Sequence, residues 1–313
     1  MKKVLITGIS GFAGWHLREY LESLAEVSVF GTDLHRLEMV KDRDNIFSID
    51  LTKRDLVEDL IQDIKPDIVF HLAALASPAQ SFEDPFLTFS NNIKAEINLL
   101  EAVRRHHNIA KILIVGSGDE YGAVCKNDNP IDEDYPMRPT SPYAVSKIAQ
   151  DYLGYQYFLS YNLKVIRVRP FNHIGARQSP KFVVSAFSKQ IAEIEAKTRE
   201  PIIKVGNLSA IRDFSDVSDM VRAYWLAINS GQIGDVYNIG TGIGHSMEEI
   251  LNILLSLSAK KIRIQIDHDL FRPSDNPVLI CNCDKFQKIT GWKPTIELNT
   301  TLKSVLNYWR TNI

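Results

Sequence analysis

The stretch KVLITGISGFAG, residues 3–14, joins a short apolar run to three glycines in the spacing G-x-x-G-x-x-G. The run Lys3–Thr7 predicts a buried strand, and the apolar periodicity of Phe12–Leu24 predicts a helix directly after it. Glycines in such a turn let backbone amides approach a pyrophosphate at the positive end of the helix, although simple turn chemistry would also favour them. We therefore expect a dinucleotide-binding turn formed by Gly8, Gly11, Phe12, Ala13 and Gly14.

Short apolar runs and amphipathic stretches alternate from this turn through about residue 170. Strands are predicted at Lys3–Thr7, Val27–Thr32, Ile46–Ile49, Ile68–His71, Lys111–Gly116 and Lys164–Arg169, and helices at Phe12–Leu24, Lys53–Ile64, Pro85–His107 and Ser141–Tyr161. Short, β-branched strands separated by helices favour a parallel sheet with right-handed crossovers. The sequence thus predicts an α/β protein whose residues 1–170 form a doubly wound, dinucleotide-binding domain.

The strict alternation loosens in residues 171–313. Helices are predicted at Val183–Thr198, Val217–Asn229, Ser246–Leu257 and Leu298–Arg310, and strands at Pro201–Val205, Val236–Ile239 and Lys261–Ile266. We expect a smaller, mixed α/β lobe that binds the substrate, with the strand near 236–239 a candidate to return to the main sheet. No flexible linker separates the two parts of the sequence, so we expect the lobes to pack against each other.

Composition narrows the class of protein. The 313 residues are 45% hydrophobic and 24% charged, with a formal net charge of −2. This balance is typical of a globular protein and does not favour binding to nucleic acid or to an anionic membrane. Three cysteines, Cys125, Cys281 and Cys283, do not form a disulfide framework, and the Cys281/Cys283 pair lacks a second ligand pair for a metal. We expect a cytoplasmic protein without a metal site.

Acidic and small residues follow the predicted strands where a dinucleotide would lie. Asp33 after the second strand can accept hydrogen bonds from an adenosine ribose and repel a 2′-phosphate, unless it only caps a helix. His35 and Arg36 nearby could instead partner a 2′-phosphate, so we expect NAD(H) or NADP(H), with NAD(H) favoured. Further cofactor contacts are expected from residues after the third and fourth strands: Asp50, Leu51, Leu72, Ala73 and Ala74.

A tyrosine and a lysine at i and i+4 indicate the chemistry. Tyr143 and Lys147 share one face of a predicted helix, and Ser117 lies just past the fifth strand. A nearby ammonium favours the phenolate, which predicts a lowered pKa for Tyr143. The phenol can then exchange a proton with a sugar oxygen while a hydride moves to or from a nicotinamide, with Ser117 bonded to the same oxygen.

These motifs together resemble those of the extended short-chain dehydrogenases/reductases. The resemblance rests on GISGFAG, Asp33, HLAA, Asn92, GSGDEYG and SPYAVSK, and it spans the chain. It implies a Rossmann lobe that holds the dinucleotide, with Asn92, Tyr143 and Lys147 among the cofactor residues. It also implies a second lobe that holds a nucleotide-diphosphate sugar, and a catalytic set formed by Ser117, Tyr143 and Lys147. A protein that only binds the dinucleotide, as a sensor, is the remote alternative.

Motifs in the second lobe are similar to the GDP-mannose branch of that family. They are Phe171-Asn172-His173, Lys181-Phe182-Val183, the run IIKVGNLSAIRDFSDV (202–217), Arg272-Pro273-Ser274-Asp275 and Thr290-Gly291-Trp292-Lys293-Pro294. By this resemblance a GDP-sugar is the substrate, contacted by Ser117, Gly118, Asn172, Lys181, Arg212 and Arg272. Ion pairing of Arg212 with Asp213 or Asp216 is the alternative. The family further implies a homodimer joined through helices near 86–106 and 142–160.

Two reactions dominate this branch, and Asp119 bears on the choice between them. A 4,6-dehydratase needs an additional carboxylate base, and in the dehydratases a glutamate stands two residues before the tyrosine of the motif that matches Asp119–Gly122. Asp119 stands at the position of that glutamate, and its side chain is one methylene shorter. The resemblance therefore favours a reductase of a 4-keto sugar over a dehydratase, with another nucleotide-sugar epimerase or reductase as the remaining alternative.

Overall fold

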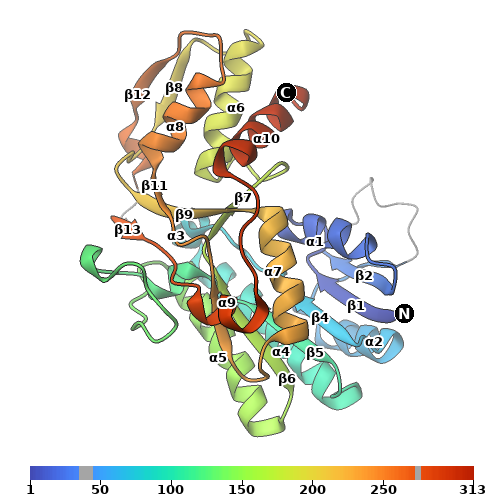
Figure 1. Cartoon of the computed structure of the whole chain (residues 1–313). Helices are drawn as coiled ribbons and strands as arrows, with labels where there is room; N and C mark the ends of the chain where they lie inside the picture. The colour runs from blue at the N-terminus through green and yellow to red at the C-terminus, as the bar shows by residue number, and fades with distance from the viewer. Residues whose placement is uncertain (35–44, 272–275) are drawn as a thin grey trace.

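The main feature of the fold is a seven-stranded sheet. The computed structural model describes residues 1–34, 45–271 and 276–313. Within them the strands run in the order β10-β6-β5-β4-β1-β2-β3, with every neighbouring pair parallel (Figure 1). Their bounds are β1 Lys2–Thr7, β2 Val27–Asp33, β3 Ile46–Ser48, β4 Ile68–His71, β5 Lys111–Val115, β6 Lys164–Pro170 and β10 Val236–Ile239.

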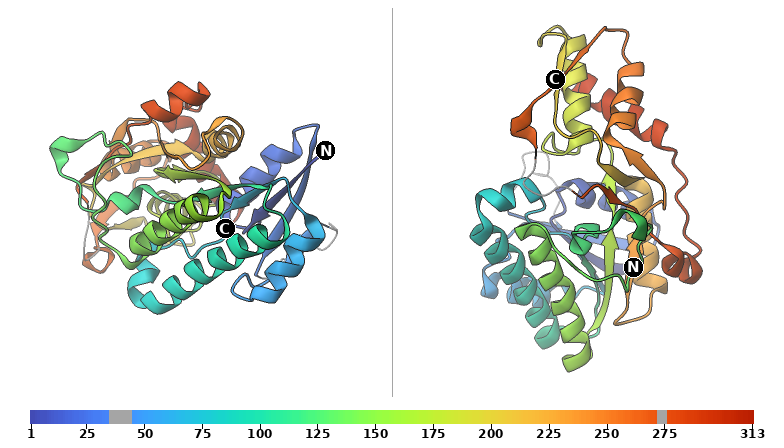
Figure 2. Two further views of the ribbon diagram at one scale, coloured as in Figure 1. Left: turned by 90° about the horizontal axis from the view of Figure 1, so that it is seen from below. Right: turned by 90° about the vertical axis from the view of Figure 1, so that its left-hand side faces the viewer.

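Helices cover both faces of this sheet because the strand residues alternate between two cores. In β1, Val4 and Ile6 belong to one hydrophobic cluster and Leu5 to the other. Helices α1 (Phe12–Glu22), α7 (Val217–Ser230) and α9 (Asp284–Thr290) contribute to the first cluster. Helices α2 (Arg54–Ile64), α4 (Pro85–His106) and α5 (Pro142–Tyr161) contribute to the second, and α4 and α5 lie side by side in Figure 2. The short α3 (Pro78–Glu83) precedes α4.

The second lobe has its own core. Helices α6 (Val183–Glu195), α8 (Met247–Ser256) and α10 (Leu298–Thr311) pack with the parallel pair β8 (Ile202–Val205) and β12 (Arg263–Ile266). A small sheet orders β11 (Gly244–Ser246), β9 (Ile211–Asp216) and β13 (Val278–Leu279), and β7 (Asn172–Ile174) also pairs with β9. In Figure 1 the β7 and β9 strands lie where the two lobes meet. Short 3-10 turns span Gly118–Tyr121, Lys126–Asp128 and His268–Leu270.

Residues beyond 170 complete the main sheet. Strand β10 pairs with β6 in parallel register, Val236 opposite Arg167, and α7 packs on the sheet beside α1. The main-sheet lobe therefore draws on both halves of the chain and is not closed at residue 170.

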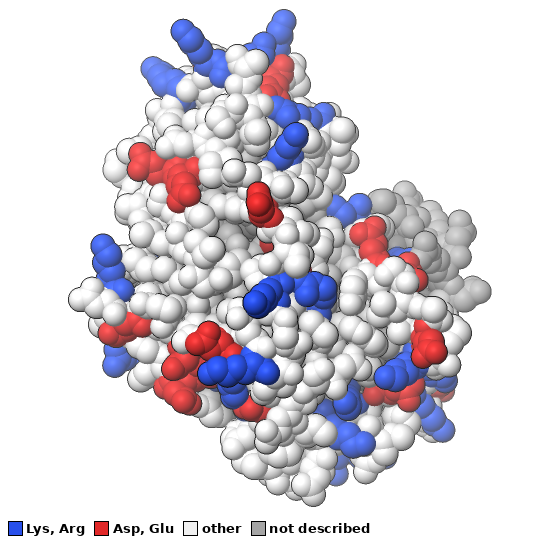
Figure 3. Space-filling model, in the orientation of Figure 1, with Lys and Arg blue, Asp and Glu red and all other residues white. Residues whose placement is uncertain are grey.

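The structure differs from the predicted elements mainly in short segments. The helix expected over Val183–Thr198 ends at Glu195, because Lys197 adopts the left-handed conformation (φ 61°). The short elements α3, β7, β9, β11, β13 and α9 were not predicted. No helix in the described ranges is long and apolar enough to cross a membrane. On the face shown in Figure 3, acidic and basic side chains are interspersed.

Candidate active site

The glycine turn between β1 and α1 is tightly packed. Gly8 has φ 71°, and a Cβ there would lie 3.0 Å from the Cα of Ala73. The Gly11 amide donates to the Gly8 carbonyl at 3.0 Å, and a Cβ on Gly14 would overlap that carbonyl. Helix α1 then begins at Phe12. Close packing within the turn and against the loop after β4 thus excludes side chains at Gly8 and Gly14, and the turn leads directly into the N-terminus of α1, where a pyrophosphate is favoured.

The residues expected near an adenosine lie at the adjacent strand ends, with local roles of their own. Asp33 is the last residue of β2. Asp50 accepts hydrogen bonds from the Thr52 hydroxyl at 2.7 Å and amide at 2.9 Å, which lower the pKa of the Asp50 carboxyl. Leu51 is buried in the core. Two residues named with Asp33, His35 and Arg36, lie outside the described residues.

The loop after β4 is held against the glycine turn. The Thr7 hydroxyl accepts hydrogen bonds from the amides of Leu72 and Ala73, each at 3.2 Å. Asn92 is fully buried, where its side-chain oxygen accepts from the Leu75 amide at 2.8 Å and its amide donates to the Ser146 hydroxyl at 3.0 Å. Asn92 therefore fixes the loop that holds Leu72, Ala73 and Ala74; its direct contact with a cofactor stays a prediction.

The serine, tyrosine and lysine meet at the carboxyl edge of the sheet. Ser117 follows β5 and lies close enough to Tyr143, which is buried on α5, to affect the pKa of the phenol. Lys147, one turn later, is also buried and donates from Nζ to the Val115 carbonyl at 2.8 Å. Ser117 also accepts from the Asp119 amide at 3.1 Å, while its own amide donates to Glu120 at 2.7 Å. This reciprocal capping fixes the serine beside the phenol.

The prediction that the pKa of Tyr143 is lowered is wrong when only the groups of the protein act on the phenol. Burial raises the pKa of Tyr143, and the negative charge of Asp119 raises it further. Burial also lowers the pKa of Lys147, to about 8. The phenol therefore stays protonated at neutral pH, ready to act as an acid.

Asp119 and Gly118 occupy the turn between Ser117 and the second lobe. Asp119 is half-buried, and its charge acts on Tyr143. Gly118 is buried against Phe171, where a Cβ would lie 3.2 Å from the ring. The charge of Glu120 acts on Tyr143 as well, so two carboxylates of this turn lie near enough to raise the pKa of the phenol.

Two of the expected substrate residues come together on the small sheet. Asn172 on β7 is opposite Phe214 of β9, two residues beyond Arg212. The Arg212 guanidinium donates to the carbonyl oxygens of Ile211 at 2.8 Å and Asn276 at 2.7 Å. Lys181 is exposed in the turn before α6, and Arg272 lies outside the described residues.

The carboxylates proposed as alternative partners of Arg212 have other bonds. Asp213 accepts from the amides of Thr241 and Gly242 at 2.9 and 2.8 Å, and from Cys281 at 3.2 Å. Asp216 accepts from the Ser218 amide and from the Thr301 hydroxyl, each at 2.7 Å. Through these bonds the two carboxylates hold loops and the N-terminus of a helix in place.

Two buried glutamates near the catalytic set were missed from the sequence. Glu120 completes the capping of Ser117, and the S-x-x-E spacing of residues 117–120 is a signal that could have found it. Glu96 shares a face of α4 with Asn92 at i and i+4, which places it toward the same interior.

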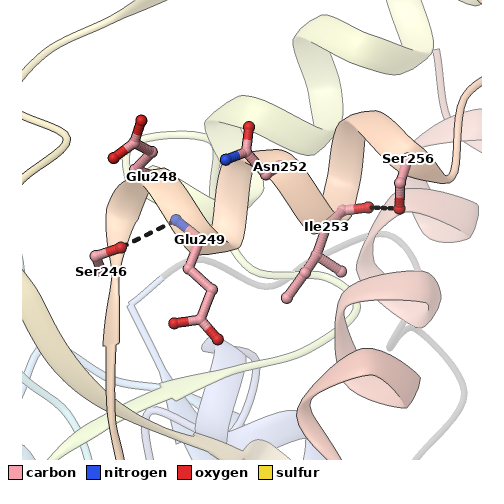
Figure 4. Close-up of a pocket in the computed structure, with 6 residues that line it drawn as sticks. All are labelled: Ser246, Glu248, Glu249, Asn252, Ile253 and Ser256. Carbon is pink, nitrogen blue, oxygen red and sulfur yellow. Dashed lines mark hydrogen bonds between the residues drawn. The ribbon is translucent and has the colours of Figure 1, made fainter.

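A depression away from these residues does not add to the site. It has a volume of about 510 Å³ and lies along α8, lined by Ser246, Glu248, Glu249, Asn252, Ile253 and Ser256 (Figure 4). Its lining includes carboxylates but no basic side chain for a phosphate.

In the described part of the chain no group of His, Cys, Asp or Glu residues is placed to hold a metal. The glycine turn and the Ser117–Tyr143–Lys147 set define a dinucleotide-dependent oxidoreductase class of site.

Comparisons with known proteins agree with this class. The family model described as GDP-mannose 4,6 dehydratase matches residues 5–305. GDP-6-deoxy-D-mannose reductase of Pseudomonas aeruginosa is 31% identical over 312 residues, covering 100% of this chain and 98% of the relative. The solved structure of RMD from Pseudomonas aeruginosa complexed with NADPH has a TM-score of 0.89 at 31% identity and covers 100% of both chains. UDP-glucose 4-epimerase of Thermus thermophilus in complex with NAD has a TM-score of 0.88 at 29% identity, covering 99% of this chain and 100% of that one.

The chain therefore belongs to the extended short-chain dehydrogenases/reductases, in the family that the GDP-mannose 4,6 dehydratase model describes. The resemblance inferred from the motifs is confirmed, as is the doubly wound α/β fold. The predicted cofactor class, NAD(H) or NADP(H), agrees with the two solved complexes.

Proposed function

We propose that this protein reduces the C4 ketone of GDP-4-keto-6-deoxy-D-mannose with NAD(P)H, giving a GDP-6-deoxyhexose such as GDP-D-rhamnose. The observation that carries the proposal is the buried Tyr143, which lies near Ser117 and one helical turn from the buried Lys147. The similarity of the whole chain to a GDP-6-deoxy-D-mannose reductase supports the substrate.

Tyr143 is the proton donor in this reaction. When bound, the reduced nicotinamide supplies the hydride. Tyr143 donates its proton to the oxygen on C4; burial raises the pKa of the phenol, so it is protonated at neutral pH but releases the proton less readily. Ser117 bonds the same oxygen and orients it. Lys147 stabilises the phenolate that remains, since an adjacent cation favours the charged form.

The dinucleotide is held at the glycine turn. Gly8, Gly11, Phe12, Ala13 and Gly14 would hold the pyrophosphate, as the positive φ of Gly8 and the crowded Gly14 position support. Asp33 would bond the adenosine ribose, which favours NADH. The GDP-sugar would be held by Asn172, Lys181 and Arg212. Of these, Arg212 would bind the diphosphate, because planar guanidinium donors suit diphosphate oxygens.

The second candidate is a GDP-mannose 4,6-dehydratase, which the description of the matching family favours. A dehydratase must remove the C5 proton with a carboxylate within hydrogen-bond reach, ~2.6–3.2 Å. Asp119 and Glu120 are carboxylates whose charges act on Tyr143, and Asp119 is one methylene shorter than the glutamate of the dehydratases at the matching position. A ketone reductase has no C5 proton to remove.

The test separates the two reactions directly. Purified protein is incubated with GDP-mannose alone, and then with GDP-4-keto-6-deoxymannose plus NADH or NADPH, and the sugars are identified by NMR. We expect no 4-keto-6-deoxy product from GDP-mannose. We also expect Asp119→Asn to keep ketone reduction within about tenfold, about 1.4 kcal/mol of barrier and too little for an essential base. Conversion of GDP-mannose that Asp119→Asn abolishes would make the dehydratase correct.

A further inference from the structure

Arg169 is a buried arginine on β6 that the proposed mechanism does not use. Its guanidinium donates from Nε and Nη2 to the Asp151 carboxylate at 2.8 and 2.6 Å. Its Nη1 donates to the Tyr121 hydroxyl at 3.0 Å and to the Glu133 carbonyl at 3.1 Å. Bonds from every nitrogen of the planar group fix its orientation. Arg169 is therefore a rigidly held cation in the interior.

The carboxyl of Glu120 lies between Arg169 and Ser117. Glu120 Oε2 is 3.2 Å from Arg169 Nε, in an ion pair whose two side chains are buried. Glu120 Oε1 accepts a hydrogen bond from the Ser117 amide at 2.7 Å. A Cβ on Gly116 would overlap the carboxyl, so the glycine before the serine leaves the room that Glu120 occupies. One side chain thus connects a rigidly held cation to the backbone of Ser117.

Asp151 extends this connection to the helix that carries the phenol. Asp151 holds Arg169 and lies on α5, about two helical turns after Tyr143 on the same side of the helix. The turn that contains Ser117 is therefore joined, through the interior, to the helix that contains Tyr143. The proposed reaction brings these two side chains to one substrate oxygen.

The charges along this path balance. Arg167 donates to the other Asp151 oxygen at 2.7 Å, so two buried arginines offset the two buried carboxylates of the path. Burial raises the pKa of Glu120 and the charge of Asp151 raises it further, whereas the charges of Arg169 and Lys147 lower it. A carboxylate also suits both contacts of Glu120, because it accepts on both oxygens, whereas an amide has one acceptor and one donor group.

We infer that Arg169 is a positioning residue, which through Glu120 holds the backbone of Ser117 in place relative to the helix that carries Tyr143. Loss of the guanidinium leaves the Glu120 carboxyl without its ion pair, and the serine turn then moves relative to the phenol. The positioning does not depend on the proposed function, and only its effect on turnover rests on that function.

The first test observes the Ser117 amide with no substrate present. In protein labelled with ¹⁵N-serine, the Ser117 signal is assigned by its loss in Ser117→Ala. Arg169→Met should shift this signal and speed its hydrogen exchange by about tenfold or more, because a hydrogen bond to a charged group is weakened. Glu120→Gln should do the same, since an amide cannot accept from both sides. It also covers a failure of Arg169→Met to fold, because Arg169 keeps Asp151 as its partner.

Arg167→Met is the matched control. It removes a buried cation from the same strand, but one whose bonds go to Asp151 and to the Gly234 carbonyl. The Ser117 signal should therefore stay in place. An unchanged signal in Arg169→Met and Glu120→Gln, or an equal change in the control, would overturn the proposal.

A double variant tests whether the two residues act along one path. Effects of independent sites add in free energy. The Arg169→Met/Glu120→Gln protein should therefore change the exchange rate of the Ser117 amide no more than the larger of the single changes. Full addition of the two effects would show that Arg169 does not act through Glu120, and the proposal would fail.

Turnover gives the functional readout. A misplacement of about 1 Å costs ~10²-fold in rate, so Arg169→Met should lower kcat by about tenfold to ~10²-fold. The Kd of the dinucleotide, measured by fluorescence titration, should stay near that of wild type. Arg167→Met should keep kcat near wild type even where both variants lower the melting temperature. If the Ser117 amide moves and kcat does not, the positioning stands and the role of Ser117 in the proposed reaction fails.

Discussion

Tyr143 and Lys147 are one turn apart on α5, and burial favours the neutral form of both. It raises the pKa of the phenol and lowers that of the amine. In a reductase, burial therefore keeps the proton on the phenol but opposes its release to the substrate, and at the lysine it opposes the positive charge. The environment of each side chain, more than its identity, therefore sets its role.

Removing the phenol oxygen tests the proton donor. Tyr143→Phe should reduce kcat by at least ~10²-fold, the low end of general acid contributions. Dinucleotide binding, measured by fluorescence titration, should remain nearly intact. Wild-type turnover by this variant would remove Tyr143 from the mechanism.

Removing the carboxylate at the end of β2 tests the cofactor preference. We expect wild type to prefer NADH, and Asp33→Ser to shift the ratio of kcat/KM toward NADPH by relieving repulsion of the 2′-phosphate. Steady-state kinetics with both cofactors measures the ratio. A tenfold preference of wild type for NADPH would contradict the assignment of Asp33.

At the scale of elements, the strands and helices with strong periodicity were predictable, and the short ones were not. The run Lys3–Thr7 and the glycines after it specify β1 and the turn because buried strands and positive φ leave a clear pattern. Strand β9 has the sequence IRDFSD, in which charged residues obscure the pattern expected of a strand. It is stabilised by tertiary contacts, because it pairs with β11 and β7 in the small sheet. The pKa of Tyr143 was equally hidden, because burial and the approach of Asp119 exist only in the fold.

Helix α5 also presents an exposed apolar stripe. Val145, Tyr152 and Leu159 are spaced by seven residues and lie at the surface, while α4 beside them exposes Phe86 and Leu87. Such a face supports the homodimer that the family resemblance implies.

A charge placed in this stripe tests the dimer. Tyr152→Glu should shift the protein from dimer to monomer in light scattering coupled to gel filtration, because a carboxylate opposes burial of the stripe. Leu56→Glu on α2, an exposed position outside the stripe, serves as the control. A wild-type monomer, or a Tyr152→Glu dimer, would contradict this interface.

At the scale of the molecule, the lobes are linked through several segments. Asp213 on β9 binds the loop after β10 and the Cys281 amide, so the strand that carries Arg212 is fixed to the edge of the main sheet. Strands β7 and β9 therefore hold the expected substrate residues in a defined position relative to the Ser117–Tyr143–Lys147 set. This arrangement suits a reaction between a cofactor in one lobe and a sugar nucleotide in the other.

The return of β10 to the main sheet has a consequence for biosynthesis. While the chain leaves the ribosome, β6 has no neighbour on its outer edge until residue 239 has been made, and the core face that α7 covers stays exposed until then. An open, apolar edge of this kind invites pairing with other nascent chains. Strands β1 to β6 are thus translated before β10, and the main sheet cannot be completed until residue 239 has been made.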